Sequence, residues 1–195
     1  MRAFIAIELP KDIKAGLSKI QEELKAESLK IEPPSISWVK PQNLHLTLKF
    51  LGDIPAEQLK EIKQIISETT KTISGFRLRL EAAGFFPNLQ TARIIWVGAN
   101  QPPPELKQLA QQLEARLVKS GMPQEERDFR PHITIGRIKN RLNSFDLEKI
   151  LDKLEKNITG SNWEFNCGEI TLFESTLGPG GPAYTVLDQC NLKIT

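Results

Sequence analysis

Apolar residues along the chain recur at two spacings, one typical of amphipathic helices and one typical of half-buried strands. Helical spacing predicts helices at about residues 11–25, 55–70, 105–119 and 144–156. Runs rich in Ile, Val and Phe, bounded by turn residues, predict the strands. The predicted strands lie at about residues 3–9, 38–39, 43–51, 76–82, 93–97, 132–138, 163–173 and 184–192. Helices and strands are therefore mixed along the whole chain.

The order of these elements repeats on either side of the proline run at residues 101–104. Consecutive prolines favour an extended connection. Each side has a helix, a histidine-bearing strand, a second helix and further strands. We therefore predict a single α+β domain over residues 1–195, with two pseudo-symmetric lobes, about 1–100 and about 101–195, around a central cleft. Each lobe should hold an antiparallel-rich sheet and helices, and terminal strands can exchange between lobes.

The segment from Gly178 to Pro182 is predicted as a loop, because it contains three glycines and two prolines. It is either a lid over the cleft or a plain connection.

Composition narrows the possible partners. The chain has 195 residues, of which 39% are hydrophobic, enough for a packed core. Its 26 Lys and Arg nearly balance 24 Asp and Glu, so contact with a nucleic acid would have to be local. Two cysteines form neither a disulfide framework nor a metal cluster and suit a reducing cytoplasm. The first apolar run ends at Glu8, too early for a signal or a membrane span, so we expect a cytoplasmic protein without membrane contact.

One four-residue pattern occurs twice and contains the only two histidines. It reads His45-Leu46-Thr47-Leu48 and His132-Ile133-Thr134-Ile135. At average composition a histidine begins such a pattern roughly once in a hundred times, so two chance matches are about a one in ten thousand event. A single histidine on a strand is usually structural. Because the pattern is repeated, a functional interpretation is favoured.

Alternation along a strand gives the repeated pattern a chemical meaning. Side chains two residues apart share a face, so His45 lies with Thr47 and His132 lies with Thr134. Two near-neutral imidazoles can act as a general acid and a general base on one phosphorus. The hydroxyls can hydrogen-bond the non-bridging oxygens. Neither motif carries a neighbouring Asp, Glu, Cys or second His at ligand spacing, so we expect no metal and no other cofactor.

With their flanks, the two motifs resemble the two-histidine phosphoesterase superfamily, and in particular its RNA 2′,3′-cyclic phosphodiesterases, formerly called 2′-5′ RNA ligases. The flanks are Trp38 to Gly52 and Arg130 to Arg137, and the opening Met1 to Ile7 is also similar. The resemblance covers nearly the whole chain. It implies two α+β lobes around a cleft and metal-independent opening of an RNA-terminal 2′,3′-cyclic phosphate to a 2′-phosphomonoester. A reversible 2′-5′ ligation is also implied.

The resemblance also implies roles for individual residues. His45 would protonate the departing O3′ and His132 would activate water, although the sequence leaves the two roles interchangeable. Thr47 and Thr134 would bind the phosphate. The substrate would be RNA with a cyclic phosphate end, tRNA fragments among the candidates, and the protein would act as a monomer.

Three further residues are candidates for binding substrate. Phe50 and Arg137 each stand five residues after a motif histidine, positions that the family uses for base stacking and phosphate contact. Strict alternation would put both on the opposite face, so a twist or bulge near Gly52 and Gly136 is required. Arg130 keeps the parity of His132 and is a second cationic candidate.

Other features receive plainer interpretations. Lys49, Lys139 and Arg141 are expected to be solvated charges, and the three tryptophans are expected in the core rather than stacked on bases.

Two alternatives to the main functional hypothesis remain open. One is a cyclic phosphodiesterase acting on another nucleotide substrate, such as an ADP-ribose cyclic phosphate or a 2′-5′ linkage. The other is a non-catalytic RNA-binding module, which the intact histidines and threonines disfavour.

Overall fold

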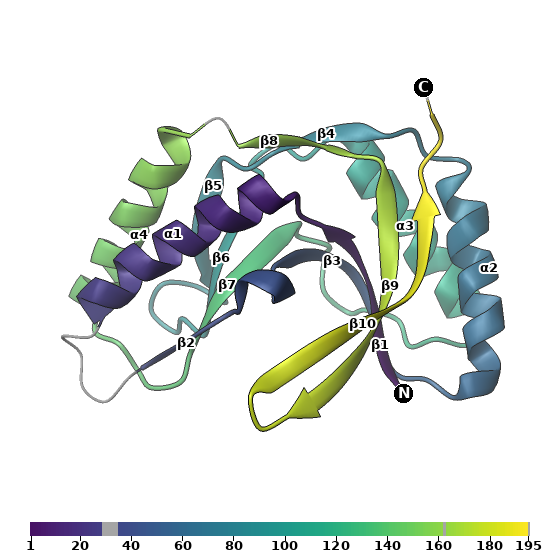
Figure 1. Ribbon diagram of the computed structural model, residues 1–195, viewed down its shortest axis with the longest axis horizontal. Coiled ribbons are helices and arrows are strands. Elements are labelled where there is room, and N and C mark those ends of the chain that lie inside the picture. The colour runs from purple at the N-terminus through teal and green to yellow at the C-terminus, as the bar shows by residue number, and fades with distance from the viewer. Residues whose placement is uncertain (29–34, 162, 195) are drawn as a thin grey trace.

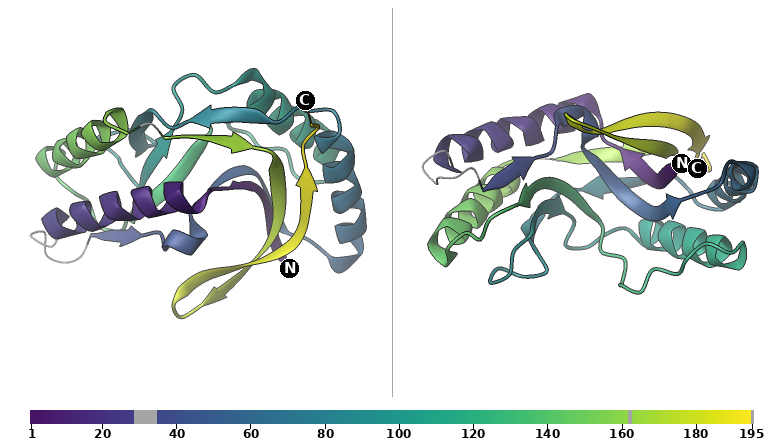
Figure 2. Two further views of the ribbon diagram at one scale, coloured as in Figure 1. Left: turned by 45° about the horizontal axis from the view of Figure 1, so that its top comes forward. Right: turned by 90° about the horizontal axis from the view of Figure 1, so that it is seen from below.

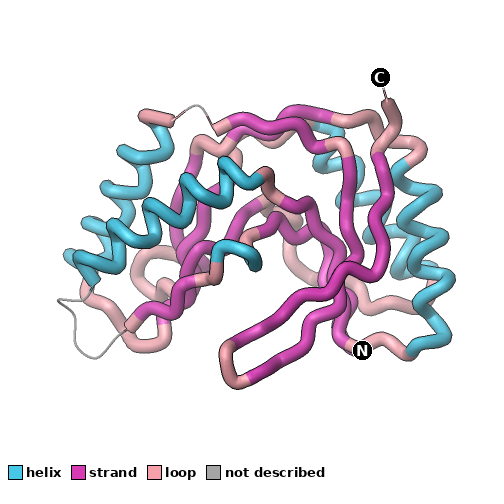
Figure 3. Tube along the Cα trace, viewed as in Figure 1, coloured by secondary structure: helices cyan, strands magenta, loops and turns pink. Residues whose placement is uncertain are grey.

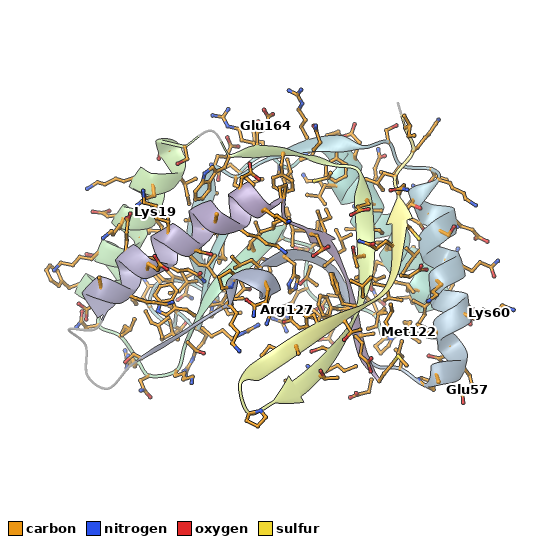
Figure 4. All side chains as sticks on the ribbon, in the orientation of Figure 1. Lys19, Glu57, Lys60, Met122, Arg127 and Glu164 are labelled. Atoms are coloured by element: carbon orange, nitrogen blue, oxygen red, sulfur yellow. The ribbon has the colours of Figure 1, made fainter. Side chains whose placement is uncertain are left out.

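The computed structural model describes residues 1–28, 35–161 and 163–194. Its four α-helices lie where apolar spacing predicts them. They are α1 (Lys11–Ser28), α2 (Leu59–Thr70), α3 (Pro104–Lys119) and α4 (Ser144–Thr159). Each helix buries the apolar stripe that predicted it, as Ile13, Leu17, Ile20 and Leu24 do on α1. Figure 4 shows Lys19 of α1 and Lys60 of α2 on the outer faces of their helices.

The strands within the described residues follow the predicted runs, with three differences (Figure 3). They are β1 (Arg2–Glu8), β2 (Ile36–Trp38), β3 (His45–Asp53), β4 (Phe76–Arg79), β5 (Ala82–Phe86), β6 (Ile94–Gly98), β7 (His132–Ile138), β8 (Glu164–Cys167), β9 (Glu169–Gly178) and β10 (Gly181–Asn191).

The first two differences are a predicted strand that is divided in two and a strand that was not predicted. The predicted strand at 163–173 is two strands, because β8 pairs with β4 while β9 pairs with β1 and β10. Strand β5 was missed, since Ala-Ala-Gly-Phe-Phe lacks a clear apolar alternation. Gly84 in β5 makes room for an indole, because a Cβ there would lie 2.8 Å from Cζ2 of Trp96.

The third difference is the predicted loop from Gly178 to Pro182, of which only Pro179 and Gly180 lie outside the strands. Strands β9 and β10 run up to a tight turn, where Gly178 pairs with Gly181. Gly181 has φ +95°, a conformation that glycine adopts without strain. The segment is therefore the tip of a hairpin that projects from the body of the protein (Figure 1).

The strands form one large antiparallel sheet and one small one. The order in the large sheet is β10-β9-β1-β3-β7-β6-β5, with β2 beside β7, while β4 and β8 pair separately. Helices α1 and α4 lie at one end of the molecule and α2 and α3 at the other (Figures 1 and 2). The prediction of a two-lobed α+β fold is confirmed. No helix within the described residues is long and apolar enough to cross a membrane.

Strands β3 and β7 each carry a bulge at the same distance from their histidine. On β1, Ile5 pairs with Lys49 and Ala6 with Thr47, which leaves Leu48 of β3 without a partner. On β6, Ile95 pairs with Gly136 and Trp96 with Thr134, so Ile135 of β7 is likewise extra. An extra residue reverses the alternation beyond it. Both strands therefore contain a bulge of the kind that is needed to bring Phe50 and Arg137 to the histidine face.

The bulge in β3 also turns Lys49 inward, so its prediction as a solvated charge is wrong. Its side chain is 5% exposed, and its Nζ lies 2.7 Å from Oε2 of Glu114 on α3. The same Nζ donates to the carbonyl of Pro123 at 2.8 Å. Burial of a charge is tolerated here because it is both paired and hydrogen-bonded.

Gly98 allows β6 to pass close to the histidine of β7. It pairs with His132, and a Cβ at this position would lie 2.6 Å from the carbonyl oxygen of Pro131. We expect Gly98→Ala to lower the free energy of unfolding by about 1–3 kcal/mol, because a backbone atom would have to move.

Gly168→Ala is the matched control, since nothing lies within 4 Å of a Cβ there. Urea unfolding of both variants measures the difference. Equal stability of the two variants would show that the backbone of β6 can move away from His132 at little cost in free energy.

Candidate active site

The two histidine motifs meet where β3 and β7 touch. The strands are antiparallel and share a single registered pair, Leu46 with Ile133, the central residues of the two motifs. Both are buried, so the residues on either side of them face the opposite way. An antiparallel pair between equivalent residues relates the motifs by a local twofold rotation. His45 and His132 then occupy diagonal positions on one face, a separation of about 7–8 Å between Cα atoms in a regular sheet.

Each imidazole is oriented by a backbone carbonyl two residues earlier. Nδ1 of His45 donates to the carbonyl of Asn43 at 2.8 Å, and Nδ1 of His132 donates to that of Arg130 at 2.7 Å. A carbonyl only accepts, so the proton of each neutral ring lies on Nδ1. The Nε2 atoms are left for chemistry. Nε2 of His45 lies 3.0 Å from Oγ1 of Thr47, which donates to it in this tautomer.

Burial disfavours the charged form of both imidazoles in the ligand-free protein. It lowers the pKa of His45 to about 4, against the hydrogen bond to Asn43, with smaller lowering from the charges of Lys14, His132 and Arg137. Burial also lowers the pKa of His132, and Arg137 adds to this effect. Arg137 therefore acts on both rings. The negative charge of a bound anion would favour the charged rings and so raise both pKa values.

The bulges place Phe50 and Arg137 on the histidine side. Phe50 is 59% exposed, and its ring centroid lies 6.0 Å from that of Phe4, which lies 4.8 Å from His45. Arg137 is exposed, while its neighbours Gly136 and Ile138 are buried. Arg130 is also exposed, and its backbone carbonyl contacts His132.

Aromatic side chains that sequence reasoning missed surround each histidine. His45 contacts Phe4 and the edge of Tyr184, with ring centroids 4.8 and 5.3 Å apart, and Phe173 lies farther off at 6.5 Å. Phe86 meets His132 edge-on at 4.8 Å. These residues come from β1, β5, β9 and β10, so their proximity follows from strand pairing that no local pattern reveals.

Trp96 was expected in the core, and it lies instead on the histidine face. It pairs with Thr134 across β6 and β7, is only half-buried and stacks on Phe86 at 5.2 Å. Trp38 and Trp163 do pack against the core.

Asn43 connects the β9–β10 hairpin to His45. Its carbonyl accepts from the imidazole, while its side-chain Nδ2 donates to the carbonyl of Pro182 at 2.7 Å. The residue is buried. The hairpin that supplies Tyr184 is thereby held in a fixed place beside one of the two histidines.

The donor set of the site suits proton transfer and anion binding. It comprises two imidazoles, two hydroxyls and a guanidinium. In the part of the chain that the structure describes, no group of three or more His, Cys, Asp or Glu residues gathers as metal ligands do.

Comparison with known proteins gives the family. A family model described as the 2′-5′ RNA ligase superfamily matches residues 18–179. The chain belongs to the 2′-5′ RNA ligase superfamily. The family resemblance seen in the two motifs is thus confirmed.

Named relatives match over nearly their full length. An RNA 2′,3′-cyclic phosphodiesterase of Methanocaldococcus jannaschii is 35% identical over 97% of this chain and 99% of its own. The Escherichia coli protein of that name is 32% identical over 95% and 93%. Among solved structures, Escherichia coli LigT complexed with 3′-AMP superposes with a TM-score of 0.73 at 33% identity, covering 98% of this chain and 97% of that one.

The buried histidines predict an unusual titration. We expect His45 to titrate at about pH 4 and His132 below 6.5, both carrying the neutral-form proton on Nδ1, because burial disfavours the charged rings and the carbonyls fix the tautomer. Long-range ¹H–¹⁵N spectra across the acidic and neutral range measure both properties. Ordinary midpoints near 6.5, or protons on Nε2, would contradict this description of the site.

Proposed function

We propose that this chain hydrolyses RNA-terminal 2′,3′-cyclic phosphates to 2′-phosphomonoesters without a metal ion. The observation that carries the proposal is the placement of two histidines on one face of paired strands, each ring held by a carbonyl at Nδ1. Relatives named for this activity match over nearly the whole chain, which supports it. A reversible 2′-5′ ligation uses the same groups in the opposite direction.

In the proposed reaction, the histidines act on opposite sides of the phosphorus. Nε2 of His132 accepts a proton from water as the water oxygen bonds to phosphorus. The bond from phosphorus to O3′ breaks, and O3′ takes a proton from Nε2 of His45. The products are a 3′-hydroxyl and a 2′-phosphomonoester. His132 ends protonated and His45 neutral, so proton exchange with solvent restores the starting state.

Charge on the phosphate is balanced by the remaining groups. The guanidinium of Arg137 and the hydroxyls of Thr47 and Thr134 would hydrogen-bond the non-bridging oxygens. Thr47 has to turn from His45 to the phosphate, because a protonated Nε2 no longer accepts. The bound anion itself raises the lowered pKa of His45, so His45 becomes protonated when the substrate binds.

Phe50 would stack on the terminal base, since its ring is exposed beside the site. Both motifs come from one chain, and we therefore propose a monomer as the active unit. Cytoplasmic RNA fragments, including those of tRNA, are the proposed substrates.

The direct test incubates an oligonucleotide ending in a 2′,3′-cyclic phosphate with the protein in excess EDTA. We expect the 2′-phosphate product to form at the same rate as without the chelator. His45→Ala and His132→Ala should each lower kcat by at least roughly a hundredfold, the scale of a positioned acid or base. Activity that is lost in EDTA and restored by a divalent ion, or near-normal turnover in either variant, would refute the mechanism.

The two arginines give a sharper comparison. Arg137→Ala should lower kcat/KM by about tenfold to hundredfold, because a charge-assisted hydrogen bond to the phosphate contributes about 1.5–3 kcal/mol. Arg130→Ala should have a much smaller effect, since it retains the backbone carbonyl that orients His132. A larger loss for Arg130→Ala would mean that the exposed Arg130 side chain, and not Arg137, binds the phosphate.

A further inference from the structure

The bulge in β7 raises a structural question, because it decides where Arg137 points. The bulge leaves Ile135 without a partner on β6 and returns Arg137 to the histidine face. Removing it would turn the side chain of residue 137 toward the core. Other contacts must therefore stabilise the bulge relative to regular pairing between β6 and β7.

In β3 the matching bulge is held by the strand's own side chain. Lys49, four residues after His45, points inward and binds Glu114 and the carbonyl of Pro123. The residue four after His132 is Gly136, which has no side chain. A Cβ there would lie 3.2 Å from Ile36 and 3.3 Å from Ile95 and Trp38, so the site has no room for an inward side chain. The β7 bulge needs support from another element.

Gln21 of α1 supplies a contact at this point. Its side-chain nitrogen Nε2 donates to the carbonyl of Ile135 and to the carbonyl of Val39, both at 2.8 Å. Ile135 is the bulged residue itself, and its carbonyl also accepts from the backbone N–H of Val39 at 3.0 Å. Gln21 is only 2% exposed. Both amide hydrogens of Gln21 therefore donate to backbone carbonyls at or beside the bulge, in a region shielded from water.

We infer that Gln21 is a positioning residue for the proposed phosphodiesterase reaction. By holding the carbonyl of Ile135, it fixes the β7 bulge and so aims Arg137 at the phosphate. It does not touch the substrate. Its effect on catalysis passes through Arg137, while its effect on folding is the ordinary one of a buried hydrogen-bonded amide.

A double-mutant cycle separates these two effects. Gln21→Met keeps a similar side-chain length and removes both donors. In the otherwise unaltered protein it should lower kcat/KM by about tenfold, the lower end of what a phosphate-bound arginine contributes. With Arg137→Ala already present, it should cost less than about twofold more, because the contact that it misdirects is gone.

Thr69→Val is the matched control. Thr69 is fully buried and donates within α2, so its replacement also removes a buried hydrogen bond. It lies on another helix and should leave kcat/KM unchanged in both backgrounds. If Gln21→Met does not fold, Gln21→Asn serves instead, since its amide is one methylene too short to reach both carbonyls.

The inference rests on the proposed function, and the two fail differently. If the unaltered protein does not open the cyclic phosphate, the proposed function is wrong. If it does, an equal fold-loss from Gln21→Met with and without Arg137, or no loss at all, overturns the role of Gln21 and leaves the proposed function intact.

Discussion

The single registered residue pair between β3 and β7 is the constraint on which the site depends. Leu46 and Ile133 pair at the centre of the large sheet, and their side chains are anchored in the core. Because a strand alternates, fixing those two residues fixes the faces of the histidines and threonines beside them. A slip of either strand by one residue would send its histidine and its threonine into the core. Burial of Leu46 and Ile133 thus sets the register, and the register determines where the histidines and threonines lie.

The two motifs are nearly symmetric, but strands from elsewhere in the chain give the two histidines different neighbours. His45 lies against Phe4 and Tyr184, while His132 meets Phe86. The hairpin fastened by Asn43 stands on the His45 side. Greater burial accompanies the more strongly lowered pKa of His45. The two rings therefore differ in their surroundings, although their sequence motifs are alike.

Much of this could be predicted from sequence, because the signals are local. Apolar periodicity gave the helices, and the repeated motif gave the histidine strands and the shared face of each His and Thr. The bulges could be anticipated only as a requirement of Phe50 and Arg137. Their positions depend on hydrogen bonding to β1 and β6, which a single strand does not encode. The same limit hid Phe4, Tyr184 and the inward turn of Lys49, since each depends on a neighbour distant in the chain.

The central claim is that both histidines face one phosphate, and binding of a product-like anion tests it most directly. Adenosine 2′-monophosphate can be titrated into the protein while the ring signals of His45 and His132 are followed by NMR. Both rings are expected to shift along one saturation curve with one Kd, and both pKa values are expected to rise, because a shared anion stabilises both charged forms. A shift of one ring alone, or two different dissociation constants, would show that the imidazoles do not converge on one site.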